Sequence, residues 1–119
     1  MKGYTRNPVG AHYGTRGWLL QRLTAFFMAI YTVGFVACLL WHVPASQADW
    51  KALFAGPVVR VATMFFFAAL LYHAWIGMRD ILMDYAKPTG LRLTLMTAVA
   101  AILVVYLIWS ASILWGVNA

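Results

Sequence analysis

Three long uncharged runs in this chain of 119 residues leave it few possible folds. They cover residues 23–48, 61–78 and 93–119. Each run supplies about 20 residues for a helix that crosses a bilayer core. Backbone groups in lipid must satisfy one another, so spanning segments must be helices, and the alternating polarity of a membrane barrel is absent. The sequence therefore predicts an all-α membrane protein with three transmembrane helices.

Composition supports the same class. Hydrophobic residues make up 64% of the chain and charged residues 10%, whereas soluble domains carry about 25% charged residues. The net charge of +6 comes from residues scattered at the segment ends, a pattern that orients a membrane protein and argues against nucleic-acid binding. We expect one membrane-anchor domain over residues 1–119, with helices at about 19–41, 58–85 and 90–115.

The distribution of lysine and arginine predicts an orientation. Four lie before or at the start of the first run, at positions 2, 6, 16 and 22, and three lie in the 79–92 connector. The 42–60 connector has two and the C-terminus has none. This excess predicts a cytoplasmic N-terminus and a periplasmic C-terminus for a multi-pass protein of the bacterial inner membrane. Residues 44–48 resemble a signal-peptide cleavage site, but the preceding apolar run exceeds 7–15 residues, so we expect a retained helix.

His73 is an ionisable residue inside the second uncharged run. Such residues are costly in a membrane and mark candidate functional sites. Positions 73, 77, 80 and 84 are spaced for one helix face, and Gly77 lies one turn from the imidazole. A glycine there leaves room for a flat group such as a porphyrin, and equally suits close helix packing. The residues alone therefore allow either a metal or haem ligand or a histidine that hydrogen-bonds another helix.

Two stretches near this histidine are specific. They are His-Ala-Trp-Ile-Gly-Met at 73–78 and Asp-Tyr-Ala-Lys-Pro at 84–88. Together with Gln-Arg-Leu-Thr-Ala at 21–25 and Leu-Arg-Leu at 91–93, they resemble the D-type hydrophobic membrane anchor of succinate dehydrogenase, respiratory complex II. The resemblance covers most of the chain. It implies half of a heterodimeric haem-binding helical bundle, whose partners are a C-type cytochrome b anchor, an iron–sulfur subunit and a flavoprotein subunit.

The resemblance also implies a haem role for His73. The matching histidine is one axial ligand of haem b, and the partner anchor supplies the other. His73 lies six residues from Arg79, or about 9 Å along a helix. His42 lies at the outer end of the first helix and His12 in the N-terminal tail. Neither reaches the depth of His73, so we expect that this chain alone cannot complete a bis-histidine site. Both are interpreted as solvated or interfacial.

Three further residues receive roles from the resemblance. Arg22 matches an arginine near a haem propionate, for which Arg16 is a weaker candidate; a positive-inside anchor is the simpler alternative. Tyr85 matches a tyrosine that donates a hydrogen bond to ubiquinone, and Asp84 is a weaker candidate beside it. A helix-end acid and an interfacial tyrosine are the alternatives there. Asp80 receives no role and is expected to pair with Arg79, Lys87 or a partner chain.

The predicted function is therefore a non-catalytic anchoring subunit of succinate:ubiquinone oxidoreductase, which acts in electron transport and the tricarboxylic acid cycle. No residue is predicted to be catalytic, because the chain has neither a nucleotide-binding glycine motif nor a cysteine cluster. The anchor of a fumarate reductase and a haem-free structural anchor are the alternatives. A transporter or proton channel ranks last, since only His73 lies deep in a predicted span.

Overall fold

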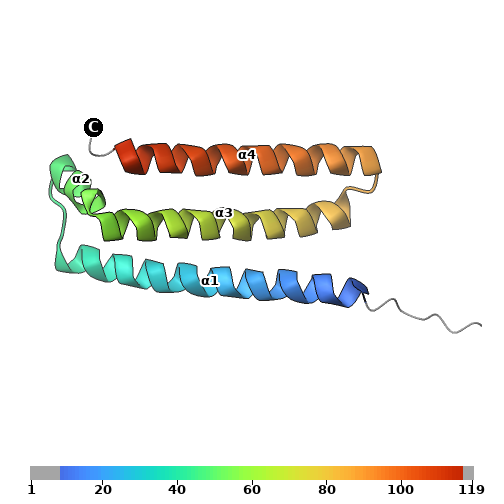
Figure 1. Cartoon of the computed structure of the whole chain (residues 1–119), viewed down its shortest axis with the longest axis horizontal. Helices are drawn as coiled ribbons and strands as arrows, with labels where there is room; N and C mark the ends of the chain where they lie inside the picture. The colour runs from blue at the N-terminus through green and yellow to red at the C-terminus, as the bar shows by residue number, and fades with distance from the viewer. Residues whose placement is uncertain (1–8, 117–119) are drawn as a thin grey trace, which may run out of the picture.

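Three long helices and one short helix make up the part of the chain that the computed structural model describes, residues 9–116, with side chains from residue 16 onward. The helices are α1 (Val9–Trp41), α2 (Gln47–Ala55), α3 (Pro57–Tyr85) and α4 (Thr89–Gly116). α3 lies between α1 and α4 and contacts both (Figure 1). These residues contain no strand, and the all-α prediction is confirmed.

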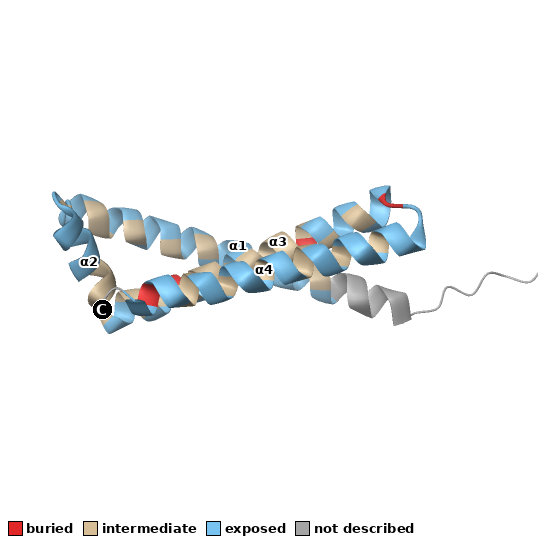
Figure 2. Cartoon of the chain, turned by 90° about the horizontal axis from the view of Figure 1, so that it is seen from above, coloured by how far each residue is buried: buried red, intermediate tan, exposed pale blue. Residues whose placement is uncertain are grey.

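Three segments are long and apolar enough to cross a membrane. They are Arg16–Trp41, Pro57–Tyr85 and Thr89–Gly116, which confirms the expected number of spans. The start of α1, the end of α3 and the start of α4 lie at one end of the bundle, which we call the α3–α4 loop end (Figure 1). α2 lies at the opposite end, called the α2 end. Seen from above, α1 crosses α3 obliquely, whereas α4 follows it (Figure 2).

The helix limits differ from expectation in two places. α1 begins at Val9, about ten residues earlier than expected, because hydropathy locates the span and not the polar helical turns before it. α2 lies in a segment that the sequence marked only as a polar connector. α3 follows the expected pattern more closely, with Pro57 in its first turn and the Ala86 N–H donating to the Leu82 carbonyl at its end.

Very few side chains are buried within this single chain. Among the described residues these are Thr63, Ile76, Ala86 and Leu114, and many large apolar side chains are exposed. Figure 2 shows that nearly all described residues are exposed or intermediate. Large exposed apolar surfaces suit contact with lipid or with other helices. The bundle is therefore built to have its outer faces covered.

Aromatic side chains fill the seam between α1 and α3. Tyr31 stacks on Phe66 with ring centroids 4.6 Å apart, and Phe27 meets Phe65 edge-on at 6.2 Å. The Tyr31 hydroxyl also hydrogen-bonds the buried Thr63 hydroxyl. Such pairs stabilise helix contacts beyond the area that they bury.

A capping box starts α2. The Asp49 N–H donates to Ser46 Oγ at 3.2 Å, and the Ser46 N–H donates to Asp49 Oδ2 at 3.1 Å. Hydrogen bonds from the Ala45 backbone, and then from Ser46, lower the pKa of the Asp49 carboxyl. A lowered folded-state pKa contributes stability at neutral pH that is lost as the pH falls through the folded value.

Replacing Ser46 by alanine should loosen the first turn of α2. The change removes the acceptor for the Asp49 N–H and should cost about 1 kcal/mol locally. Hydrogen exchange of the amides at 49–51 should then become severalfold faster, while α4 amides keep their rates. Acidification should also lower the protection of these amides relative to their intrinsic exchange rates, because it protonates Asp49. Unchanged exchange at 49–51 would contradict the capping role.

Candidate functional site

His73 lies on α3 and is half-buried against α1. Its Nδ1 is 3.0 Å from Thr24 Oγ1, and its Nε2 is 3.3 Å from Gln21 Nε2. Gln21 and Thr24 are three residues apart on α1 and so share one helix face. The imidazole therefore forms a polar contact between two largely apolar spans.

The surroundings of Thr24 indicate which ring nitrogen carries the proton. A threonine hydroxyl has one proton, and the Thr24 hydroxyl lies 2.8 Å from the Leu20 carbonyl and 3.0 Å from the Gln21 carbonyl. With its proton donated to the backbone, Thr24 Oγ1 accepts from His73 Nδ1–H. Nε2 is then the nitrogen with a lone pair, which the Gln21 amide meets with a long hydrogen bond.

Beside His73 lie an unpaired hydrogen-bond acceptor and an open space, which together could accommodate a bound group. The Gln21 carbonyl oxygen Oε1 is buried and has no hydrogen-bond partner among the described residues. An unpaired buried acceptor costs about 1–3 kcal/mol. Gly77, one turn along α3, faces open space: a Cβ there would meet no atom within 4 Å. The glycine therefore is not required by close packing between helices of this chain.

Arg22 is exposed on α1, directly after the residue that contacts His73. Its guanidinium lies over the Trp18 ring, 5.1 Å from the ring centroid, a geometry that suits a cation–π contact. No ion pair joins it to a carboxylate among the described residues. The side chain is thus held near the α3–α4 loop end with its charge unneutralised by the described part of this chain.

Asp84 and Tyr85 end α3 at the α3–α4 loop end. Both are exposed, and Tyr85 has an exposed fraction of 81%. The described residues offer neither side chain a hydrogen bond or an ion pair. Asp80 pairs with Arg79 at 3.7 Å, one of the partners considered for it, and the exposure of both groups makes this a weak interaction.

The remaining histidines and basic residues lie apart from His73. His42 is exposed at the end of α1, at the α2 end. The side chain of His12 lies outside the described residues, as do Lys2 and Arg6. Within the described part no group of three or more histidine, cysteine, aspartate or glutamate side chains is placed to hold a metal ion.

Gln21 and Thr24 received no role of their own from the sequence motifs. Two polar residues three apart at the start of an apolar helix are nevertheless a signal for a polar partner. Which partner they would meet depends on the rotation and register of α1 against α3. Residue spacing within one helix does not specify either quantity.

Comparison with known proteins identifies the family. Residues 5–109 match the model of the succinate dehydrogenase/fumarate reductase transmembrane subunit. The chain is 41% identical over 102 residues to a succinate dehydrogenase hydrophobic membrane anchor subunit of Coxiella burnetii (strain RSA 493 / Nine Mile phase I), covering 86% of this chain and 89% of that protein. The protein of the same description in Rickettsia bellii (strain RML369-C) is 30% identical over 103 residues, covering 79% and 75%.

These matches span most of both chains. The protein therefore belongs to the succinate dehydrogenase/fumarate reductase transmembrane subunit family, and its relatives are membrane anchors of succinate dehydrogenase. The resemblance inferred from residues 21–25, 73–78 and 84–88 is confirmed. A multi-pass membrane anchor is also what the three apolar helices provide.

Proposed function

We propose that this chain is the D-type anchor of a succinate:ubiquinone oxidoreductase, in which it shares a haem b with a C-type cytochrome b anchor and contributes to the site of ubiquinone reduction. In this role it holds the flavoprotein and iron–sulfur subunits at the membrane and is not catalytic by itself. The observation that carries the proposal is the environment of His73. Its Nδ1 is held by Thr24 and its Nε2 lone pair meets only a long contact.

The residues present fit a haem group. A haem-ligating histidine needs a neutral imidazole with one nitrogen free to bind iron and the other hydrogen-bonded. Thr24 is the hydrogen-bond partner of Nδ1. The Gln21 amide would have to move away from Nε2 to leave that nitrogen free for iron. The open space at Gly77 allows a flat group to approach this face. The Arg22 guanidinium, which has no carboxylate partner among the described residues, suits a carboxylate such as a haem propionate.

When bound, the haem would supply a one-electron carrier within the membrane. The residues of this chain would position the ligand and balance charge. Thr24 keeps the Nδ1–H tautomer and the ring orientation of His73. Arg22 offsets negative charge at the bundle end. A second protein ligand to the haem iron would come from the partner anchor, since His42, the other histidine whose side chain is described, lies at the opposite end of the bundle.

Tyr85 and Asp84 are proposed to belong to the ubiquinone site. Quinone reduction develops negative charge on a carbonyl oxygen and consumes protons from water, so a phenol at the interface suits both needs. The Tyr85 side chain is 81% exposed in this chain, so its hydroxyl is accessible to a partner or a substrate. Asp84 precedes it and is a weaker candidate.

We also propose that the α3–α4 loop end faces the cytoplasm. Among the described residues, Arg16, Arg22, Arg79, Lys87 and Arg92 belong to this end, and Lys51 and Arg60 belong to the α2 end. The excess follows the positive-inside rule. The C-terminus would then be periplasmic, in a bacterial inner membrane.

Two other functions are the alternatives, and one experiment tests the second of them. A fumarate reductase anchor shares this architecture and runs the reaction in reverse. A haem-free anchor would use His73 only for the helix contact seen here. A reduced-minus-oxidised absorption spectrum of the complex, purified through a tag on this chain, separates the second from the proposal. A b-type haem band beside flavin and iron–sulfur absorption is expected, and flavin without haem would overturn the haem assignment.

Thr24→Val should weaken haem binding without removing the ligand. The change deletes the acceptor for His73 Nδ1–H, and loss of such a partner typically lowers metal affinity about 10–100-fold. The measurement is haem content and midpoint potential of the purified complex. Thr32→Val is the matched control, because the Thr32 hydroxyl is exposed and bonds only the Met28 carbonyl in the described part. Equal effects of both variants would contradict the positioning role of Thr24.

Tyr85→Phe should slow ubiquinone reduction by a factor on the order of 10², since it removes a donor to a developing oxyanion. Succinate-driven reduction of a soluble dye should be unchanged. Tyr106→Phe on α4 serves as the control and should affect neither activity. A parallel fall of the quinone and dye activities in Tyr85→Phe would show that the phenol supports the fold instead of the quinone.

A further inference from the structure

Two arginines from different helices line one pocket at the α3–α4 loop end. Arg16 of α1 and Arg79 of α3 border a cavity of about 490 Å³, whose other walls include Leu20, Ile76 and Tyr72. The Arg79 side chain reaches α1 beside Gly17: a Cβ on Gly17 would lie 3.4 Å from an Arg79 guanidinium nitrogen, an ordinary contact distance. Arg79 Nε is buried and has no hydrogen-bond partner among the described residues. We call this cavity the arginine pocket.

The arginine pocket does not coincide with the proposed haem-facing side. Arg16 and Arg22 are six residues apart on α1, which separates them by about 120° around the helix. Arg79 is two residues from Gly77 on α3, which separates them by about 160°. The two arginines of the pocket therefore lie on a different flank of the α1–α3 seam from Arg22 and Gly77. This separation makes Arg16 a poor candidate for a haem propionate.

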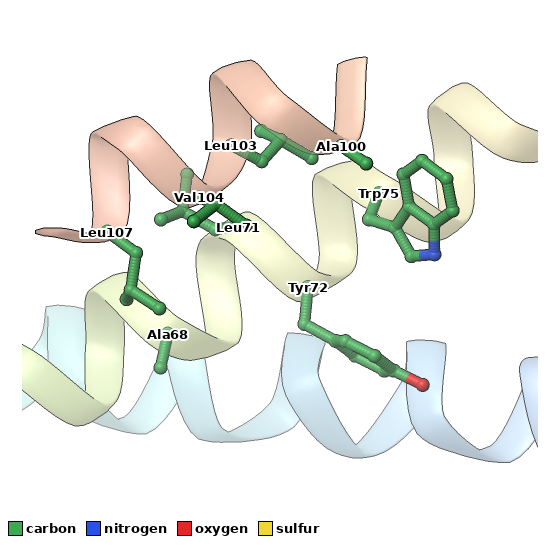
Figure 3. A pocket seen from close by; sticks show the side chains of 8 residues that line it. All are labelled: Ala68, Leu71, Tyr72, Trp75, Ala100, Leu103, Val104 and Leu107. Atoms are coloured by element: carbon green, nitrogen blue, oxygen red, sulfur yellow. The ribbon is translucent and has the colours of Figure 1, made fainter. Parts of the chain in front are cut away.

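An apolar groove adjoins the arginine pocket. It has a volume of about 240 Å³ and lies between Ala68, Leu71 and Trp75 of α3 and Ala100, Leu103 and Leu107 of α4. Figure 3 shows Tyr72 extending from this groove towards α1. Tyr72 lines both cavities. The groove and the pocket are thus neighbours along one flank of the bundle.

The dimensions suit a membrane lipid. From Ala68 to Arg79 the groove and pocket span eleven residues of α3, about 16 Å at 1.5 Å per residue. One leaflet of a bilayer core is about 15 Å deep, half of the roughly 30 Å total. A charged head held at the arginines would therefore let an acyl chain reach the end of the groove within a single leaflet.

We propose that this flank binds one anionic phospholipid, with its phosphate between Arg16 and Arg79 and an acyl chain in the apolar groove. Guanidinium groups bind phosphate in bidentate fashion, and basic pockets between membrane helices are suited to anionic lipid heads. Asp80 opposes this charge only weakly, because it is 3.7 Å from the Arg79 guanidinium and its side chain is 63% exposed. The proposal does not depend on the haem or quinone assignments.

The test measures lipid bound to the intact detergent-purified complex by native mass spectrometry, with phosphatidylglycerol and phosphatidylcholine as probes. Preferential binding of phosphatidylglycerol is expected. Arg79→Gln and Arg16→Gln should each lower its affinity about fivefold. Arg92→Gln removes a charge at the same end outside the pocket and should leave the preference intact. Arg16 is exposed, so Arg16→Gln should not disturb folding. It therefore still tests the proposal if the complex that carries Arg79→Gln does not assemble.

A second arm separates a lipid from a free phosphate. Ala100→Phe fills the groove and leaves both arginines, whereas Ala101→Phe changes the neighbouring exposed residue. Only the first should reduce phosphatidylglycerol binding, and millimolar inorganic phosphate should displace the lipid poorly. Ready displacement by phosphate together with no effect of Ala100→Phe would assign a soluble anion and overturn the proposal. Equal binding of both lipids, no bound lipid, or equal effects of Arg92→Gln and Arg79→Gln would also overturn it.

Discussion

The arrangement of this bundle depends on polar contacts set into the seam between α1 and α3. Near the α3–α4 loop end, His73 meets Thr24 and Gln21, and farther along, Tyr31 meets Thr63. Individual interhelical hydrogen bonds in membranes are modest, averaging about 0.6 kcal/mol. They nevertheless constrain the helix register, because a slide of α1 by one turn would separate the His73 imidazole and the Tyr31 hydroxyl from these partners in an apolar setting. These contacts therefore favour a single register.

Aromatic side chains beside these contacts act in the same direction. Phe27 and Tyr31 of α1 meet Phe65 and Phe66 of α3, and Phe35 of α1 meets Phe54 of α2. The single chain nevertheless buries little, with three apolar residues and Thr63 buried among those described. The seam holds α1 on α3, but the outer faces remain apolar. Such a chain is suited to be one component of a larger membrane assembly, as the family to which it belongs indicates.

The same seam divides the α3–α4 loop end into two flanks with different chemistry. One flank carries Arg22 and the open space beside Gly77, next to the histidine. The other carries Arg16 and Arg79 around a cavity that adjoins an apolar groove. Basic residues that look equivalent in a count of charges therefore have different surroundings. The positive-inside pattern explains why they are at this end and does not explain how they are grouped.

Sequence alone determined much of this protein. Uninterrupted apolar length predicted the spans, because lipid requires helices, and the motifs around His73 and Tyr85 identified the family. Those signals lie within one segment each. Only the tertiary structure decided that Thr24 and Gln21 contact His73, and that Arg16 of α1 and Arg79 of α3 line one cavity. The physical reason is that α1 and α3 are apolar on nearly every side, so hydrophobic patterning does not specify which face of one packs against the other. α2 was missed because a short capped helix in a polar connector carries no hydropathy signal.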